Sequence, residues 1–590
     1  MRFPTISEIA QYRDMTTAFG GYNHQLSCQE GQFYDMKNIT TQYFPLLSPR
    51  QNRGIVKKLN NPQGILDKED LLWIDNQKLY INGEERRLNG VEISAEPKTL
   101  AKMGAFVIIM PDRIWYNVDK NECGYMEKSK TITSNITFSL CEANGKAITA
   151  PDASYYESNT PKDGDYMLST KNGKTSLKVY SSTTKTWLTV ATTYVQITAA
   201  GIGEGFEKED GIKLTLKNKV DALANIFVNN EDNGGMSTNN VIVDKTNDSI
   251  TITGILGGTT VELTDNELTL ERKVPDMAFI TECNNRLWGC SKDGHEIYCC
   301  KLGDVKNWNC FAGVSTDSWA ATIGSDGKFT GAITYLGYPI FFKEDSLIKI
   351  AVSGTGGHQI KETKCRGVQK GSHNSLSILN EVLYYKSSTC VCGYNGSLPY
   401  SISDELGEVR YYDAVAGSLG DRYYISMRDA KGTYSLFVYD TKNGMWCKED
   451  NTKVKFFCKH LDDLYFIDNF RQMKSVRGTL LYDVPERKTE DKFDWFVESG
   501  VIGYASPDNK YVARINLRIT LEFGTNVDFY LQYDSSGEWE HKFNMSGKGT
   551  RTFSVPIIPK RCDHFKYKLS GKGGCKIHSI AKTMEEGSDI

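Results

Sequence analysis

The pattern that decides the fold first occurs as Leu72-Trp73-Ile74-Asp75-Asn76-Gln77-Lys78-Leu79-Tyr80. It joins a short apolar run, a polar turn and an aliphatic–aromatic step, and seven copies occur along the chain. From the fourth copy onward the spacing is even, and a hairpin period of roughly 40–50 residues is typical of β-propeller blades. The copies end in Leu79-Tyr80, Ile114-Trp115, Leu287-Trp288, Ile340-Phe341, Leu383-Tyr384, Tyr423-Tyr424 and Leu464-Tyr465.

The repeat predicts an all-β chain built on a six- or seven-bladed β-propeller. The count stays open between six and seven because a terminal copy can be closed by strands from elsewhere in the chain. The predicted propeller covers residues 61–128 and 274–484. Residues 1–60 are polar, and we expect an extended N-terminal arm there with one short helix over residues 6–15.

The period is interrupted once, between Ile114 and Leu287, where the gap is several times the spacing of the later copies. The intervening residues 129–273 are rich in Thr, Ser, Asn and Gly and contain short strand patterns. They predict an inserted β-rich region grown out of a propeller loop, where long insertions cost little. One helix is expected there, over residues 220–227. The predicted strands are residues 176–180, 186–190, 211–216, 249–253 and 260–263.

The last part of the chain has a different texture. Residues 485–492 are highly charged and predict a linker. Residues 514–523 then alternate strictly between apolar and polar side chains, so one face is buried and the other is solvated. Together with strand patterns at 528–533, 552–557 and 564–569, this predicts a C-terminal β-sandwich, jelly-roll-like, over residues 493–590.

Composition limits the class of protein. The 590 residues carry a formal net charge of -3, so overall charge favours neither nucleic acid nor a membrane surface. The longest apolar run, residues 104–110, is far too short to span a bilayer. The start Met1-Arg2-Phe3-Pro4 lacks the apolar stretch of a signal peptide. The fifteen Cys are an odd number without framework spacing, which favours reduced thiols over disulfides.

We predict no enzymatic activity, because no nucleophile, phosphate-binding or dinucleotide-binding motif occurs. Propellers do host glycosidases, and the carboxylates Asp70, Glu282 and Asp317 are the candidates for such chemistry. Nothing in the sequence places two of them about 5–10 Å apart, as a glycosidase needs.

We also predict no metal or cofactor. A dense thiol cluster with His295 could supply zinc ligands, but its spacing is not that of paired zinc motifs, and buried filler is favoured. Filler is likewise favoured for Cys390 and Cys392, which share one strand face. Residues 229–234 imitate half a calcium loop, but Asn240 stands where an acid is required. The clustered thiols are Cys283, Cys290, Cys299, Cys300 and Cys310.

Two surface features suggest partners. Between His541 and His578 there are nine Lys or Arg against the single acid Asp563. A solvated strand face or a protein contact is favoured over DNA for this segment. The aromatic side chains Trp187, Trp539 and Tyr533 could stack on sugar rings, although a place in the core is favoured for each.

Several stretches resemble tail proteins of bacteriophages and prophages. In the arm these are Gly20-Gly21-Tyr22 and residues 33–40 and 43–50; in the propeller they are residues 280–289, 302–308 and 338–347. The chain is similar, more distantly, to the tail nozzle, or packaged-DNA stabilisation, proteins of short-tailed phages. The resemblance covers residues 15–115 and 276–480.

The resemblance implies a structural virion protein made in the host bacterial cytoplasm. It would form a homo-oligomeric ring, hexameric, around a channel that double-stranded DNA crosses, without membrane insertion. Its neighbours would be portal, adaptor or other tail proteins and tail fibres. The alternative is a carbohydrate- or receptor-binding adhesin of the tail, for which the insert and the sandwich are the expected binding modules.

Overall fold

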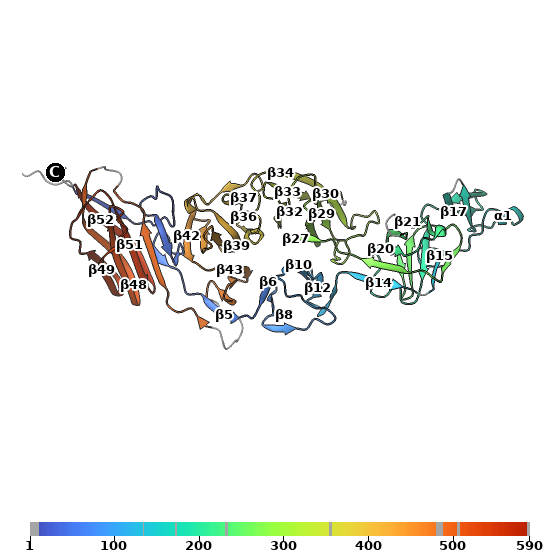
Figure 1. The fold of residues 1–590 in the computed structure, drawn as a ribbon, viewed down its shortest axis with the longest axis horizontal. Coiled ribbons are helices and arrows are strands. Elements are labelled where there is room, and N and C mark those ends of the chain that lie inside the picture. Colours follow the sequence, from blue (N-terminus) through green and yellow to red (C-terminus); the bar gives the residue numbers. More distant parts are fainter. Residues whose placement is uncertain are drawn as a thin grey trace, which may run out of the picture.

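The computed structural model describes residues 11–133, 135–171, 174–230, 234–352, 357–478, 488–503 and 508–586. Nearly every element in these residues is a strand, which confirms the all-β fold. Three bodies lie in a row, with the C-terminal sandwich at one end, the propeller in the middle and the insert at the other end (Figure 1). No helix in the described part is long and apolar enough to cross a membrane.

In the described residues the propeller has seven blades: six are four-stranded antiparallel sheets, and the seventh has a fifth strand at its edge. The first two blades contain β6 (Pro62–Lys68), β7 (Asp70–Asp75), β8 (Lys78–Ile81) and β9 (Glu84–Arg86), then β10 (Thr99–Met103), β11 (Phe106–Met110), β12 (Ile114–Asn117) and β13 (Glu122–Tyr125). Blades three and four contain β27 (Met277–Cys283), β28 (Arg286–Ser291), β29 (Glu296–Cys299) and β30 (Trp319–Thr322), then β31 (Gly331–Tyr335), β32 (Tyr338–Phe342), β33 (Ser346–Ala351) and β34 (Gln359–Lys364). Blades five and six contain β35 (Ser377–Leu379), β36 (Val382–Lys386), β37 (Val391–Tyr394) and β38 (Tyr400–Ser401), then β39 (Tyr411–Leu419), β40 (Arg422–Asp429), β41 (Tyr434–Asp440) and β42 (Met445–Asp450).

The seventh blade closes the ring with a strand from the N-terminal arm. Its first three strands are β43 (Val454–His460), β44 (Asp463–Asp468) and β45 (Gln472–Ser475), and its fourth is β5 (Gly54–Lys58). Antiparallel pairing of β45 with β5 joins Ser475 to Gly54. The innermost strand β43 then contacts β6 of the first blade, so the ring leaves no open seam there.

The seven sequence copies mark the seven blades one for one. In blades three to seven the aliphatic–aromatic step lies on the second strand, as Leu287 does on β28. In the first two blades it lies on the third strand, because Leu79 belongs to β8 and Ile114 to β12. The pattern cannot distinguish the two positions, since both consist of neighbouring buried strands that flank a polar turn.

The insert leaves the ring between blades two and three. One of its sheets has the order β14 (Lys128–Ile132), β26 (Leu268–Arg272), β20 (Gly211–Leu216), β22 (Met236–Val241) and β21 (Val228–Asn229). The second has the order β23 (Asp244–Lys245), β24 (Ser249–Thr253), β19 (Tyr194–Thr198), β15 (Ile136–Cys141) and β25 (Thr260–Leu263). A smaller sheet, β16 (Tyr166–Lys171), β17 (Lys174–Ser181) and β18 (Thr186–Thr189), extends beyond them.

Each of the five strands predicted in the insert is a strand. The helix predicted over residues 220–227 is wrong, because that segment holds a single 3-10 turn, η1 (Asp221–Leu223). A short helix that was not predicted, α1 (Tyr155–Ser158), precedes β16. Two further 3-10 turns lie in the propeller, η2 (His373–Ser375) and η3 (Asp404–Leu406).

The sandwich is organised by one long bent hairpin of β48 (Lys510–Tyr533) and β49 (Glu540–Val555). The first half of β48 pairs with β52 (Cys575–Glu586), and its second half pairs with β51 (Phe565–Lys572). The bend falls at Gly524, whose φ of 72° suits a residue without Cβ and coincides with a shift in register. The remaining strands are β47 (Asp494–Ser499), β50 (Arg561–Cys562), β1 (Gln11–Thr16) and β2 (Phe33–Lys37).

The alternation predicted for residues 514–523 holds as far as residue 522 and fails at Phe523, which is 82% exposed just before the bend. Ile515, Leu517, Ile519 and Leu521 are buried, with exposed or half-buried residues between them. The predicted helix over residues 6–15 is wrong where it can be tested, because residues 11–16 form β1 and pair with β52. Its first residues, 6–10, lie outside the described part.

Short strands complete the arm and the connection to the sandwich. They are β3 (Ile39–Thr40), β4 (Ser48–Pro49) and β46 (Lys488–Thr489). Of the predicted linker over residues 485–492, residues 485–487 lie outside the described part, and β46 pairs with β5 at the edge of blade seven.

Candidate functional site

The innermost strands of the seven blades surround a cavity of about 540 Å³ at the centre of the ring. Its described lining is mostly apolar or small, and it contains no Asp or Glu side chain. The His373 ring packs at a tilt against Phe279 with ring centroids 5.1 Å apart, and burial lowers the pKa of His373. The one lysine, Lys98, is held by Asp112 at 2.8 Å. The lining therefore supplies neither a carboxylate pair nor a free cation.

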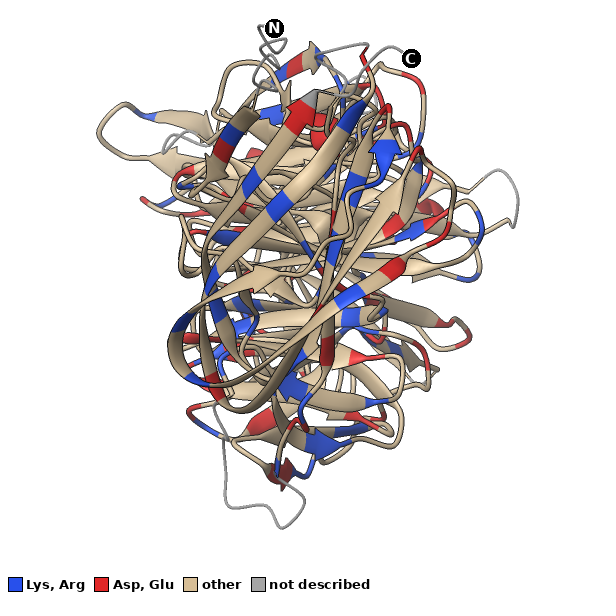
Figure 2. Cartoon of the chain, turned by 90° about the vertical axis from the view of Figure 1, so that its left-hand side faces the viewer, with Lys and Arg blue, Asp and Glu red and all other residues tan. Residues whose placement is uncertain are grey.

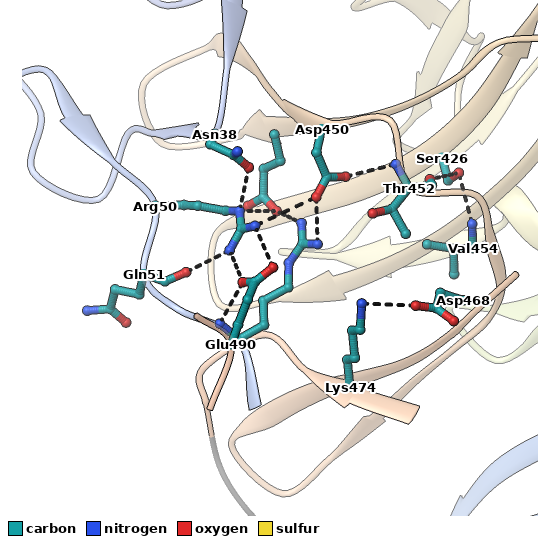
Figure 3. Close-up of polar contacts among 12 residues, drawn as sticks. Asn38, Arg50, Gln51, Ser426, Asp450, Thr452, Val454, Asp468, Lys474 and Glu490 are labelled. Carbon is teal, nitrogen blue, oxygen red and sulfur yellow. Dashed lines mark hydrogen bonds and ion pairs between the residues drawn. The ribbon is translucent and has the colours of Figure 1, made fainter. Parts of the chain in front are cut away.

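A second candidate site lies where the arm, blades six and seven and the sandwich meet. Arg50 and Arg53 leave the arm just before β5, and their side chains are 5% and 2% exposed. Three carboxylates surround them (Figure 3). Arg53 donates to Asp450 at 2.7 Å and to Glu449 at 2.5 Å. Arg50 forms a bidentate pair with Glu490 at 2.7 and 3.1 Å, and we call these five residues the junction network.

The buried charges of the junction network stabilise one another. Burial alone would raise the pKa of Asp450, but Arg53, Thr452 and Arg50 lower it to about 2. The pKa of Glu490 is also lowered, because hydrogen bonding to Arg50 and the charges of Arg50 and Arg53 outweigh the effect of burial. Arg53 is shifted in the opposite direction, since the nearby acids raise its pKa against burial. At neutral pH Arg53, Asp450 and Glu490 are therefore ionised.

The junction network lies beside a continuous apolar core. One hydrophobic cluster includes Tyr22 and Phe33 of the arm, Trp446 of blade six and Trp495 of the sandwich. The Tyr22 amide donates to the Trp446 carbonyl at 2.6 Å. A polar pocket of about 820 Å³ opens next to the network, and its lining from the arm and the blades includes Arg422. The arm thus joins sandwich and propeller into one packed unit.

The base of the insert, where it meets the ring, also contains buried polar contacts. Arg272 at the end of β26 forms a 2.5 Å ion pair with Asp210, and both side chains are almost fully buried. Asn307, in the loop between β29 and β30, accepts from the Gly211 amide at 3.1 Å and donates to the Glu209 carbonyl at 2.7 Å. The base of the insert is therefore bound to blade three through several independent polar contacts.

A third candidate site is an aromatic cluster at the far tip of the insert, where α1 and β17 lie (Figure 1). Trp187 on β18 contacts Tyr156 and Tyr180 with ring centroids 4.8 and 5.3 Å apart. Tyr155 packs on Tyr156 at 5.1 Å and is 51% exposed. Next to Trp187, Leu188 is 48% exposed. We call these five residues the tip cluster.

Sequence reasoning selected Trp187 but missed its partners. The repeated Tyr155-Tyr156 next to an acidic turn carried the only signal in the sequence. The other two aromatic candidates are covered. Tyr533 is 4% exposed beneath Lys542 and Lys560, and Trp539 lies under Lys568 at 5.6 Å.

The three candidate carboxylates are not brought together by their contacts. Asp70 is exposed at the start of β7 in the first blade. In blade three, Glu282 accepts from the Asn285 amide at 2.8 Å, and Asp317 accepts from the Gly313 and Val314 amides at 2.7 and 3.1 Å. Glu282 and Asp317 therefore each hold a turn of the backbone in their own blade.

The clustered thiols of blade three are all buried, whereas His295 is exposed on the turn after β28. Burial raises the pKa of Cys283 and Cys310 to about 11 and that of Cys299 to about 12. Within the described residues no group of three His, Cys, Asp or Glu has the geometry of a metal site.

The calcium-like loop can be tested only in part. Residues 231–233 lie outside the described part, and Asn240 donates to the Thr253 carbonyl at 2.8 Å.

The basic C-terminal segment does not form one positive face. Acidic and basic side chains are interspersed over this end of the molecule (Figure 2). Glu540 pairs with Lys542 and Lys560 at 2.7 and 3.3 Å. Lys566 and Lys576 lie over aromatic rings of the arm. Several of these lysines therefore hold the arm and the sandwich together.

Comparisons with known proteins give weak structural likenesses. No family model and no curated protein sequence matches this chain. An exo-β-1,3-galactanase from Phanerochaete chrysosporium is 10% identical with a TM-score of 0.22, over 52% of this chain and 96% of the galactanase. Hsv2 from Kluyveromyces marxianus is 10% identical with a TM-score of 0.22, over 41% and 72%. A structure described as a glycoside hydrolase is 11% identical with a TM-score of 0.18, over 52% and 98%.

The prediction that the chain is not an enzyme is contradicted by these comparisons, because similar structures include glycoside hydrolases. At such TM-scores the likeness assigns no substrate and no catalytic residue to this chain.

Proposed function

We propose that this chain is a structural component of a bacteriophage tail, in which its propeller connects two β-modules within a ring of identical subunits. The observation that carries the proposal is the attachment of those modules on opposite sides of the closed ring. The insert leaves between blades two and three, and the sandwich packs on blade six. In a ring of seven blades these positions are nearly diametrically opposed, as Figure 1 shows.

Buried ion pairs at both attachments support a mechanical role. Arg53 with Asp450 fixes the arm to blade six beside the sandwich, and Arg272 with Asp210 braces the base of the insert next to its contacts with blade three. Removal of one partner from such a pair is strongly destabilising, so each pair stiffens the attachment beside it. The sequence resemblance to tail nozzle proteins supplies the biological setting and the expected partners: further copies of the chain, other tail proteins and DNA in the lumen of the ring.

Electron microscopy of the purified full-length protein tests this proposal. We expect class averages that show hexameric rings, and we expect the protein in purified virions by mass spectrometry. Particles that stay monomeric at all concentrations, together with absence from virions, would contradict it.

The tip cluster favours a second function, binding of carbohydrate at the end of the insert. Aromatic rings supply flat apolar surfaces for sugar faces, and Tyr155 and Leu188 are exposed beside Trp187. A glycan array probed with the full chain would detect this function. We expect Tyr155→Ala to weaken binding at least about tenfold, which is about 1.4 kcal/mol.

Phe470→Ala is the matched control, because Phe470 is 71% exposed on a turn of blade seven, far from the tip. Binding that is lost equally in both variants, or that is absent from the array, would refute a carbohydrate site in the tip cluster. Assay of the bound glycans for new reducing ends would distinguish binding from hydrolysis.

A further inference from the structure

Blade five contains a pair of thiols in direct contact. Cys390 follows the turn between β36 and β37, and Cys392 lies two residues later on β37. Their sulfur atoms are 3.5 Å apart. Cys392 is fully buried, whereas Cys390 is half-buried at the surface end of the strand. The pair therefore combines one accessible sulfur with one protected sulfur.

The accessible sulfur is surrounded by hydrogen-bond donors. Besides the Cys392 thiol, Arg366 Nη1 lies at 3.5 Å, Ser387 Oγ at 3.4 Å and Thr389 Oγ1 at 3.7 Å from Cys390 Sγ. Donors placed around a sulfur stabilise its thiolate over its thiol form. Hydrogen bonding from Cys392 is the largest of the effects that lower the pKa of Cys390, and the same contact raises the pKa of Cys392.

Other titratable groups nearby favour the same charge state. The buried Lys386 ammonium interacts with both sulfurs, although burial lowers its own pKa to about 8. Tyr385 and Tyr423 face the pair from blades five and six, and burial raises the pKa of each, so both are neutral. Cys365 lies near Tyr385 and is also neutral, because burial raises its pKa.

No other thiol of this chain has a comparable environment. All fifteen cysteines lie in the described part, and the pKa of each of the other fourteen is raised, in most by burial. Burial raises the pKa of half-buried Cys28 to about 11 and that of Cys458 to about 12. Half-buried Cys123 packs against an apolar cluster and donates to the Asn89 carbonyl. Partial exposure alone therefore does not explain the environment of Cys390.

We propose that Cys390 and Cys392 form a peroxide-sensitive redox pair. The Cys390 thiolate attacks one oxygen of a hydroperoxide, the O–O bond breaks, and Cys390 becomes a sulfenic acid while the peroxide leaves as hydroxide or alkoxide. The Cys392 sulfur then attacks Cys390 Sγ. The S–O bond breaks, the Cys392 proton and the hydroxyl group leave as water, and a disulfide forms.

The geometry allows the second step without a large backbone movement. Cys390 lies just before β37, and two residues of extended chain separate Cα atoms by about 6.6 Å, near the upper end of the range of about 4.4–6.8 Å found for disulfides. The sulfur atoms must approach from 3.5 Å to about 2.05 Å. This inference does not depend on the proposed function, because it rests on blade five alone.

Mass spectrometry of the peroxide-treated full chain tests the pair. Trypsin releases residues 387–410 as one peptide that holds both thiols and no other cysteine. We expect this peptide to lose two hydrogens and to become resistant to alkylation at peroxide exposures that do not yet oxidise Cys28 or Cys123. Cys392→Ser should stop at a sulfenic acid that dimedone traps, and Cys390→Ser should give neither product. Cys365→Ser should behave like the wild type.

The pH dependence of alkylation tests the thiolate separately. Between about pH 6 and 8 we expect the iodoacetamide rate at Cys390 to change less than about threefold, whereas the rate at Cys123 rises about tenfold per pH unit. Arg366→Met should make the Cys390 profile steeper. An equally steep profile at Cys390 in the wild type, or peroxide oxidation of Cys123 as fast as that of residues 387–410, would overturn the proposal.

Discussion

Removal of Arg53 tests the junction network most directly. The substitution Arg53→Met keeps the apolar part of a side chain that is 2% exposed and deletes its charge. Asp450 and Glu449, which receive its hydrogen bonds at 2.7 and 2.5 Å, are then left buried without their principal cation. Arg50 compensates only in part, because it lies 3.7 Å from Asp450 and 4.0 Å from Glu449.

The size of the loss follows from the titration of Asp450. A pKa of about 2, against about 3.9 for a free Asp, corresponds to about 2.6 kcal/mol of stabilisation at neutral pH. Arg53 is the largest contributor to that lowering, and Glu449 also loses a charged hydrogen bond. We therefore expect Arg53→Met to destabilise the junction by about 3 kcal/mol, which agrees with the general cost of breaking a buried pair.

The assay must report on the junction, because a chain with three bodies does not unfold in one two-state step. Native-state hydrogen exchange in β5 and β42 measures local opening there. Arg87→Met is the matched control, since Arg87 is exposed in blade one and its loss should change stability by less than about 0.5 kcal/mol. Adding Asp450→Asn to Arg53→Met should recover part of the loss. The reasoning would be refuted if Arg53→Met lowered the exchange protection of β5 and β42 no more than the control Arg87→Met does.

Three further outcomes are expected. The carboxylates Asp450 and Glu490 have lowered pKa values in the folded chain, so their contribution to folding stability is present above about pH 4 and is lost as the pH falls toward 2. Calorimetry should show a steep drop in melting temperature over that pH range, and Arg53→Met should make the drop smaller. Gly21→Ala should destabilise the arm by about 2 kcal/mol, because the φ of Gly21 is 80° and the new Cβ would lie 2.4 Å from the Trp446 carbonyl oxygen. Faster hydrogen exchange in β2 would reveal this loss, and an unchanged exchange rate would contradict the prediction. Arg272→Met should leave Asp210, whose side chain is 1% exposed, buried without its cation. Hydrogen exchange should therefore increase in β20 and β26, while β48 stays protected.

The repeat in the sequence predicted the architecture well because blade strands are short, local and nearly fully buried. Each copy places two apolar strands on either side of a polar turn, and that requirement is visible within a single hairpin. The same locality explains why the pattern gives no sign that the aliphatic–aromatic step falls on the third strand, β8 or β12, in blades one and two. Closure by β5 could not be predicted, because Gly54–Lys58 is only partly buried and its partner β45 lies at the opposite end of the propeller sequence.

The candidate sites were harder to predict for a related physical reason. Glu490 lies in a charged stretch that predicts a solvated linker, yet it pairs with Arg50 of the distant N-terminal arm. A local sequence cannot distinguish a solvated charge from one that is buried opposite a distant partner. Cys390 shows the converse case. The alternation of residues 390 and 392 correctly places both thiols on one face, but the donors around Cys390 depend on the turns that surround it.

The arm explains why propeller and sandwich behave as one body. It supplies β1 and β2 to the sandwich, and then β5 to the last blade of the propeller. Neither fold is complete without the same short segment, and Arg50 and Arg53 lie between its two contributions. Opening of blade seven would therefore expose the junction charges and free one edge of the sandwich at the same time.

The insert is joined differently: β14 and β26 lead into and out of it, and the pair of Arg272 with Asp210 braces its base. None of these contacts involves the arm, and the polar contacts at its base reach blade three rather than blade seven. We therefore expect this attachment to open independently of the arm, so that strain applied at the tip is not transmitted to ring closure. If Arg272→Met also raised hydrogen exchange in β5, the two attachments would instead be coupled.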